Sequence, residues 1–103
     1  MNRVAALTLG LLISSSTMAG HHDEAVINSG SELQDWCKEE SEATLTGRGL
    51  TPFNWTASHW DNVNTLMVKG EWRTSGTNSV VVQCSVARGA QARFATLSIQ
   101  DSQ

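Results

Sequence analysis

The 103-residue sequence has no glycine-rich phosphate-binding loop and no serine or cysteine nucleophile motif. It also has no excess of basic residues, because seven Lys and Arg stand against ten Asp and Glu, a net charge of −3. This charge excludes a nucleic-acid-binding protein that depends on bulk positive charge. The length allows one domain and excludes a separate cofactor domain. These absences predict a protein that is not an enzyme.

Long hydrophobic runs are also missing, and the one apolar run is short. It covers residues 4–13, follows the positive charge of Arg3, and leads through small residues to Ala19. This order is typical of a secretory signal peptide over residues 1–19. A membrane anchor is the alternative, but the run is about half of the ~20 residues that a spanning helix needs. We therefore expect a soluble periplasmic protein, with no membrane insertion after the signal is removed.

Cysteine is scarce, since only Cys37 and Cys84 are present. Two cysteines in an exported domain predict one disulfide. The chain-entropy model gives a loop of about 48 residues a stabilisation of roughly 4 kcal/mol. A redox pair is the alternative, but such pairs usually have Cys-x-x-Cys spacing. No His is close to either cysteine, which disfavours a thiolate metal site.

Residues 20–30 show no sustained period and predict a flexible lead-in to a single domain over residues 31–103. Ser31 and Gln34 have the spacing of a capping box, which predicts a helix over residues 32–46. Gly47 or Gly49 can end this helix in a left-handed conformation. The residues that share one face of the helix are Leu33, Trp36, Cys37, Glu40, Ala43 and Thr44.

Four later segments alternate apolar and polar residues with period 2, as half-buried strands do. They cover residues 53–59, 65–73, 79–87 and 93–99. Short turns between them predict antiparallel neighbours. The fold class is therefore α+β, with one N-terminal helix packed on a four-stranded antiparallel meander sheet and linked to it by the disulfide. The residues expected to face the helix are Phe53, Trp55, Ala57, His59, Leu66, Val68, Gly70, Trp72, Val80, Val82, Cys84, Val86, Ala95, Leu97 and Ile99.

Trp60 and Glu40 are candidate binding residues. Trp60 has the parity of the polar sheet face, where an exposed Trp can stack on a sugar or anchor a protein partner. Alternatively, it folds back onto the core with the other three Trp residues. Glu40 lies near the middle of the helix's apolar arc, either as a buried acid or paired with Arg73 or Arg93.

The N-terminus that cleavage after Ala19 would expose is a candidate metal site. Gly20, His21 and His22 match the amino-terminal motif that binds Cu(II) or Ni(II), with a free amine and His in third position. The amine, two deprotonated amides and the His22 imidazole can form a square plane of nitrogens. A polar tail that carries two His residues by chance is the alternative. No other cofactor is expected.

His59 has inward parity and needs a partner, either a backbone carbonyl or Asp61 in a small polar site. Glu40 has no obvious second carboxylate for acid–base chemistry. A small hydrolase that uses Glu40 or His59 is therefore the least favoured alternative.

The run LTPFNWTASHWDNVNTLMVKGEWR and the later run VVVQCSVARGAQARFATLSI resemble uncharacterised small exported proteins of Gram-negative bacteria. The resemblance extends from Trp36 and Cys37 to Ile99 and implies a periplasmic address. The order of helix and meander is also similar to small periplasmic interaction modules, including β-lactamase-inhibitor-like folds, an analogy that assigns no function.

The leading expectation is a non-catalytic binding or interaction module. Its expected partner is an unknown protein or a saccharide and not a nucleic acid, because cleavage after Ala19 leaves a net charge of −4. The alternative is a Cu(II)- or Ni(II)-binding protein that uses the N-terminus described above.

Overall fold

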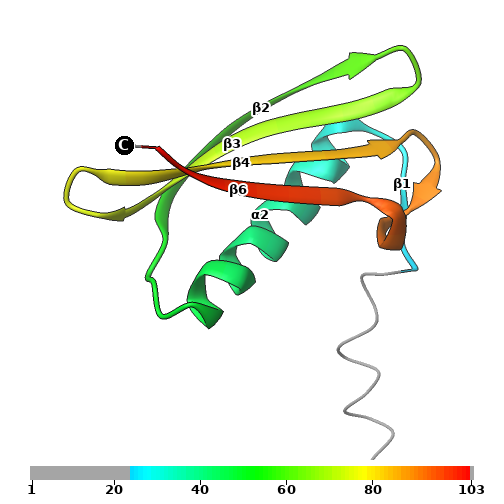
Figure 1. Ribbon diagram of the computed structural model, residues 1–103. Coiled ribbons are helices and arrows are strands. Elements are labelled where there is room, and N and C mark those ends of the chain that lie inside the picture. The colour runs from blue at the N-terminus through cyan, green and yellow to red at the C-terminus, as the bar shows by residue number, and fades with distance from the viewer. Residues whose placement is uncertain (1–23, 103) are drawn as a thin grey trace, which may run out of the picture.

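The computed structural model describes residues 24–102 and has one helix packed on a four-stranded antiparallel sheet (Figure 1). The strand order is β2-β3-β4-β6, with a separate two-stranded pair of β1 and β5. The α+β prediction is therefore confirmed. In chain order the elements are β1 (Val26–Ile27), α2 (Gly30–Gly47), β2 (Phe53–Asn62), β3 (Thr65–Ser75), β4 (Asn78–Ala87), β5 (Ala90–Gln91), the 3₁₀ turn η1 (Ala92–Phe94) and β6 (Thr96–Ser102).

The helix begins two residues before its predicted start. Ser29 is the N-cap, and its hydroxyl accepts a hydrogen bond from the Glu32 amide. The Glu32 carboxylate accepts in return from the Asn28 amide at 2.7 Å. The predicted Ser31 and Gln34 capping box is therefore wrong, because Ser29 and Glu32 have the same spacing and satisfy the free amides.

The C-terminus of α2 follows the prediction. Gly49 is left-handed, with φ +88°, and its amide donates to the Thr46 carbonyl. The Leu50 amide donates to the Leu45 carbonyl at 3.0 Å, which completes a Schellman motif.

The segment before the helix is not a free lead-in. Val26 pairs with Gln91 and Ile27 pairs with Ala90 in an antiparallel ladder. Ile27 is only 3% exposed and belongs to the core. The prediction of flexibility over residues 20–30 is thus wrong from Val26 onward, while residues 20–23 lie outside the described part of the chain.

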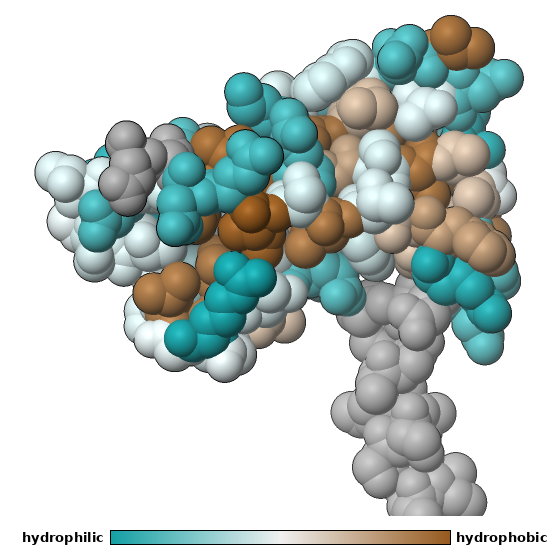
Figure 2. Space-filling model, viewed as in Figure 1, coloured by the Kyte–Doolittle hydropathy of each residue, from teal (hydrophilic) through white to brown (hydrophobic). Residues whose placement is uncertain are grey.

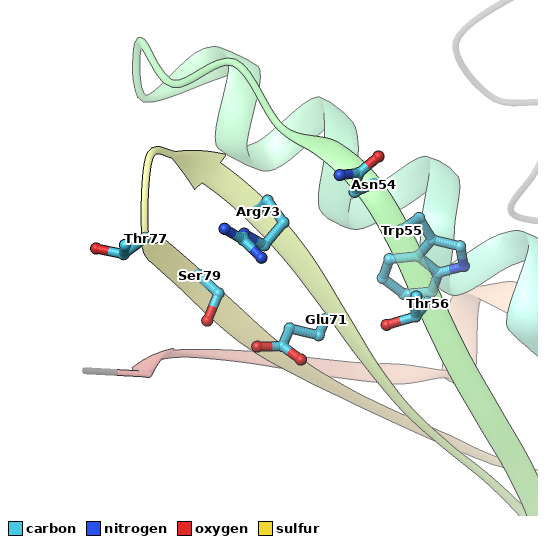
Figure 3. Close-up of a pocket in the computed structure, with 7 residues that line it drawn as sticks. All are labelled: Asn54, Trp55, Thr56, Glu71, Arg73, Thr77 and Ser79. Carbon is cyan, nitrogen blue, oxygen red and sulfur yellow. The ribbon is translucent and has the colours of Figure 1, made fainter.

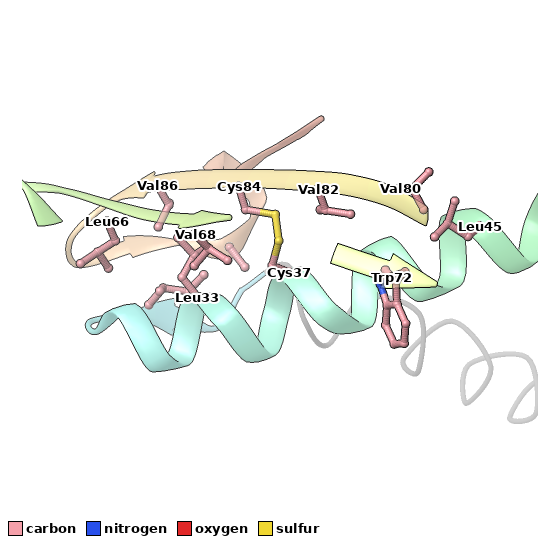
Figure 4. Close-up of a cluster of buried hydrophobic side chains, with 12 residues drawn as sticks. Leu33, Cys37, Leu45, Leu66, Val68, Trp72, Val80, Val82, Cys84 and Val86 are labelled. Atoms are coloured by element: carbon pink, nitrogen blue, oxygen red, sulfur yellow. A yellow bond between two sulfur atoms is a disulfide. The ribbon is translucent and has the colours of Figure 1, made fainter. Parts of the chain in front are cut away.

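The disulfide and the core join the helix to the sheet (Figure 4). Cys37 on α2 is bonded to Cys84 on β4, with the two Cα atoms 6.1 Å apart. The predicted pairing is confirmed, as is the parity that placed both residues inward. The buried hydrophobic residues are Ile27, Leu33, Cys37, Leu45, Leu66, Val68, Trp72, Val80, Val82, Cys84, Val86 and Ala92.

The tryptophan rings pack where the sheet has least side-chain volume. Trp72 is buried, and its ring centre lies 5.0 Å from that of Trp55. A Cβ atom at Gly70 would lie 2.2 Å from the Trp55 ring, so Trp55 fills the space above this glycine. Trp36 and Trp55 are half-buried against the core.

The inward parity fails at the start of β2. The register shifts between Phe53 and Thr56, and Phe53 is 42% exposed. The extra residue of a bulge reverses the side-chain alternation on one side of it. The prediction that Phe53 faces the core is therefore wrong.

The fourth strand of the sheet begins later than predicted. Ala92–Phe94 form a 3₁₀ turn, so β6 begins at Thr96 rather than near Arg93. Leu97 pairs with Cys84 and Ile99 with Val82, which confirms their predicted inward parity.

Candidate functional site

The sheet face opposite α2 is covered by no element within residues 24–102. Its side chains form cross-strand rows because the four strands are paired without a crossover. We call this surface the open face. Its three central rows are Trp60–Met67–Ser85–Thr96, Ser58–Lys69–Gln83–Ser98 and Thr56–Glu71–Val81–Gln100.

The open face is hollowed along its length. A cavity of about 600 Å³ lies at the end next to the β3–β4 turn. Further hollows of about 310 Å³ and about 180 Å³ lie over the middle of β3 and between β4 and β6. These hollows are shallow and open to solvent, so a ligand bound there would contact the sheet on one side.

The largest of these three hollows has a polar lining drawn from three strands and one turn (Figure 3). Figure 3 shows Glu71 and Arg73 projecting from the same side of β3. The Arg73 guanidinium donates to the Gly76 carbonyl at 2.6 Å, which fixes it beside the β3–β4 turn. Its remaining N–H groups are donors for a ligand. The lining residues are Asn54, Trp55, Thr56, Glu71, Arg73, Thr77 and Ser79.

Asn54 lines this cavity from the bulge in β2, on the side where regular alternation from Thr56 also places it. Its φ of 56° is left-handed, a conformation that Asn adopts more easily than most residues. Bulges occur beside functional sites because they redirect a side chain out of the regular alternation. The Asn54 amide, both donor and acceptor, lies at the rim of the cavity beside the bulge, which turns Phe53 outward.

The chemistry of the open face is that of hydrogen bonding. Lys69, Glu71 and Arg73 supply two positive charges and one negative charge along β3. Hydroxyl and amide side chains on the other strands surround them, and Val81 is the apolar residue of the row that contains Glu71. The cavity lining holds a single carboxylate, Glu71. Such a lining can hydrogen-bond a polar ligand.

The two candidate binding residues lie on opposite sides of the sheet. Trp60 is 44% exposed and pairs with Met67 at one end of the open face. Glu40 is half-buried on a flank of α2, and Ser41 occupies the buried stripe instead. Within residues 24–102 no ion pair joins Glu40 to Arg73 or Arg93. The structure therefore separates Trp60 from Glu40.

His59 and Asp61 have different partners. The His59 Nδ1 donates to the Gln34 side-chain oxygen at 2.9 Å, and the ring lies against Gly30. Asp61 pairs with Arg88 near the end of the hairpin. The two side chains therefore do not form the small polar site that was considered for them.

The candidate metal ligands Gly20, His21 and His22 lie outside the described residues. Among residues 24–102, no three His, Cys, Asp or Glu side chains are close enough together to hold a metal ion. The copper or nickel site stays a prediction.

Sequence reasoning placed some residues of the cavity on the correct face and missed others. The period of β3 put Glu71 and Arg73 on the polar side. The period of β2 put Asn54 and Thr56 on the polar side, although no local pattern announces the bulge. Thr77 was assigned to a turn, and only the pairing of β3 with β4 brings this turn to the rim.

Comparison with protein-family models, with curated proteins and with solved structures found no match. Over residues 24–102, no helix combines the length and the apolar character needed to cross a membrane. The function is therefore argued from the site.

Proposed function

We propose that this protein is a non-catalytic binding module, and that its open face binds an oligosaccharide. One observation carries the proposal: three adjacent hollows lie on the single sheet face that α2 leaves uncovered. The disulfide and the core hold the opposite face to the helix. The strands can therefore present a rigid ligand surface that changes little on binding.

The composition of the open face favours a saccharide over a protein partner. The cores of protein interfaces are depleted in Ser, Lys and Glu and enriched in aromatic residues and Met. The middle row of the open face is Ser58, Lys69, Gln83 and Ser98, and three of these four residues are of the depleted types Ser and Lys. Sugar hydroxyl groups, in contrast, donate and accept together, and they match hydroxyl, amide and charged side chains.

Trp60 provides the apolar contact that sugar recognition also needs. Its side chain is exposed in the row that also contains Met67. A large aromatic side chain with little conformational freedom is well suited to stack on the face of a sugar ring. A chain of several sugars could extend from Trp60 across Lys69 to the cavity beside Arg73.

We also propose that the protein acts in the periplasm after removal of residues 1–19. The disulfide supports this location, because such bonds persist in oxidising compartments. The apolar run after Arg3 supports export. The periplasm contains polysaccharides, so the location agrees with the proposed ligand class.

The proposal is tested by screening the labelled protein on an array of oligosaccharides and titrating the best ligand by calorimetry. Glu71→Gln removes the carboxylate from the largest cavity and keeps its shape, while Trp60→Ala removes the stacking surface. Each should weaken binding by about tenfold or more, equivalent to roughly 1.4 kcal/mol. Glu42→Gln changes an exposed acid on α2 and should leave the affinity unchanged.

Two results would contradict the proposal. The first is an array on which no oligosaccharide binds the folded protein above the level of the denatured protein. The second is an equal affinity for the Glu71→Gln, Trp60→Ala and Glu42→Gln variants, which would move any binding away from the open face.

A further inference from the structure

The two edges of the four-stranded sheet are built differently. β2 forms one edge and β6 the other, and within residues 24–102 each pairs on one side only. β2 is interrupted by its bulge, holds Asn54 in a left-handed conformation and carries Asp61 in an ion pair. Bulges and charges are the features by which proteins keep an edge strand from pairing with another chain.

β6 has none of these features over residues 96–100. The segment contains no charge, no proline and no glycine. Its pairing with β4 runs without a register shift from Ser79 to Ser85. The first charged side chain is Asp101, near the end of the strand. A straight, uncharged edge of this kind is ready to accept another strand.

The helix also leaves an apolar margin next to β6. α2 packs mainly against β2, β3 and β4 and has few contacts with β6. Leu97 and Ile99 point to the helix side of β6 but stay half-buried. Figure 2 shows hydrophobic side chains gathered where β6 passes over α2. An additional strand beside β6 would extend the sheet over this margin.

We propose that the occupant of this edge is β6 of a second copy of the chain, in an antiparallel two-fold pair. If the two-fold axis of this pair is perpendicular to the sheet, the helices of both copies lie on the same face of the joined sheet. With Ser98 opposite Ser98 of the second copy, Leu97 meets Ile99 on the helix side and Thr96 meets Gln100 on the open face. In this register the two Asp101 side chains do not face each other, so the edge is self-complementary.

This pairing would join the two sheets and make their open faces continuous. The inference goes beyond the proposed saccharide binding and does not depend on it, because it rests on the edge and not on the open face. If both hold, the dimer presents two ligand sites on one surface. A polymeric saccharide could then be bound by both at once, with a gain in overall affinity.

Sedimentation of the purified protein over a range of concentrations tests the pairing. The wild-type protein should change from monomer to dimer mass as its concentration rises. Ser98→Lys places two lysines directly opposite each other and should weaken dimerisation by about tenfold or more. Ser58→Lys is the matched control, since Ser58 is also exposed and lies at the other end of the same row on β2. It should leave the dimer intact.

A cysteine variant gives a second test that does not depend on weakening the fold. Residues directly opposite in an antiparallel pair have Cα atoms about 4.5 to 5.5 Å apart, a separation that a disulfide can span. Ser98→Cys should therefore form a covalent dimer under mild oxidation, seen as doubled mass without reductant. Ser58→Cys should remain monomeric under the same conditions.

A wild-type protein that stays monomeric at about 1 mM would overturn the proposal and leave the edge to a strand of another protein. Loss of the dimer in Ser58→Lys but not in Ser98→Lys would assign the contact to β2 and overturn it as well. Equal rates of cross-linking for Ser98→Cys and Ser58→Cys would do the same.

Discussion

Replacement of Ser41 by alanine should destabilise the protein through the loss of one buried hydrogen bond. Ser41 is fully buried on α2. Its hydroxyl accepts from the indole N–H of Trp72 at 2.8 Å and donates to the Cys37 carbonyl at 2.6 Å. This hydroxyl is the hydrogen-bond acceptor for the indole N–H of Trp72, a residue that is only 4% exposed.

The size of the effect follows from what each residue loses. A buried indole N–H without a partner costs about 1–3 kcal/mol. Alanine has the higher helix propensity, which offsets about 0.5 kcal/mol of this cost. We therefore expect Ser41→Ala to lower the free energy of unfolding by about 1–2 kcal/mol, a loss of several degrees in Tm for a domain of this size.

Urea denaturation followed by tryptophan fluorescence measures the effect, and Thr44→Ala is the matched control. Thr44 makes the same bond to the carbonyl four residues earlier, that of Glu40, but Trp72 donates to Ser41 and not to Thr44. Its replacement should be nearly neutral. A double-mutant cycle with Trp72→Phe should give a coupling of about 1 kcal/mol. Equal losses of unfolding free energy for Ser41→Ala and Thr44→Ala, or a coupling energy of zero, would show that the bond from Trp72 to Ser41 does not stabilise the protein.

Three further predictions concern the core, the disulfide and the N-terminus. Gly70→Ala should lower the free energy of unfolding by about 1–3 kcal/mol, because its Cβ would overlap the Trp55 ring. Gly47→Ala is the control, since the space around Gly47 is open and its replacement should not lower stability. Thermal denaturation of the two variants measures the difference. Reduction of the Cys37–Cys84 bond should cost about 4 kcal/mol in urea denaturation, and a loss below about 1 kcal/mol would contradict the loop-entropy argument. If mass spectrometry finds a mature chain that begins at Gly20, Cu(II) titration should show a site that His22→Ala abolishes, and an unchanged titration would exclude it.

The main architecture was predictable because two independent periods agree. The helical period placed Cys37 on the apolar face of its helix, and the alternation of the third strand placed Cys84 inward. A single covalent bond then fixes which faces meet. The alternation in β3 likewise assigned Leu66 and Val68 to the core and Lys69 to the open face.

The features that failed depend on contacts between distant segments. Ile27 is held by pairing with Ala90, more than 60 residues later, and no local pattern indicates that strand. The first helical residue, Gly30, has no room for a side chain because His59 packs on it, and a Cβ there would lie 2.3 Å from the ring. Trp36, Ala43 and Thr44 drew the predicted apolar arc toward Glu40, although Ser41 is the buried residue.

The open face was half predictable for the same reason. Alternation identified the outward side chains of β3, and Trp60 was assigned to the polar face. The bulge beside Asn54, which turns Phe53 outward, comes from the pairing of β2 with β3 and has no signal in the sequence. The hollow shape of the face likewise depends on the twist of the whole sheet.

The most direct test of the open face is a map of amide chemical shifts on adding the oligosaccharide selected by the array. We expect the largest changes in amide chemical shift on β3 and β4, around Glu71 and Gln83, with further changes as far as Trp60 on β2. The amides of the exposed side of α2, such as Glu42, should not move. Chemical-shift changes centred on α2 or on the β1–β5 pair would show that the ligand binds elsewhere than on the open face.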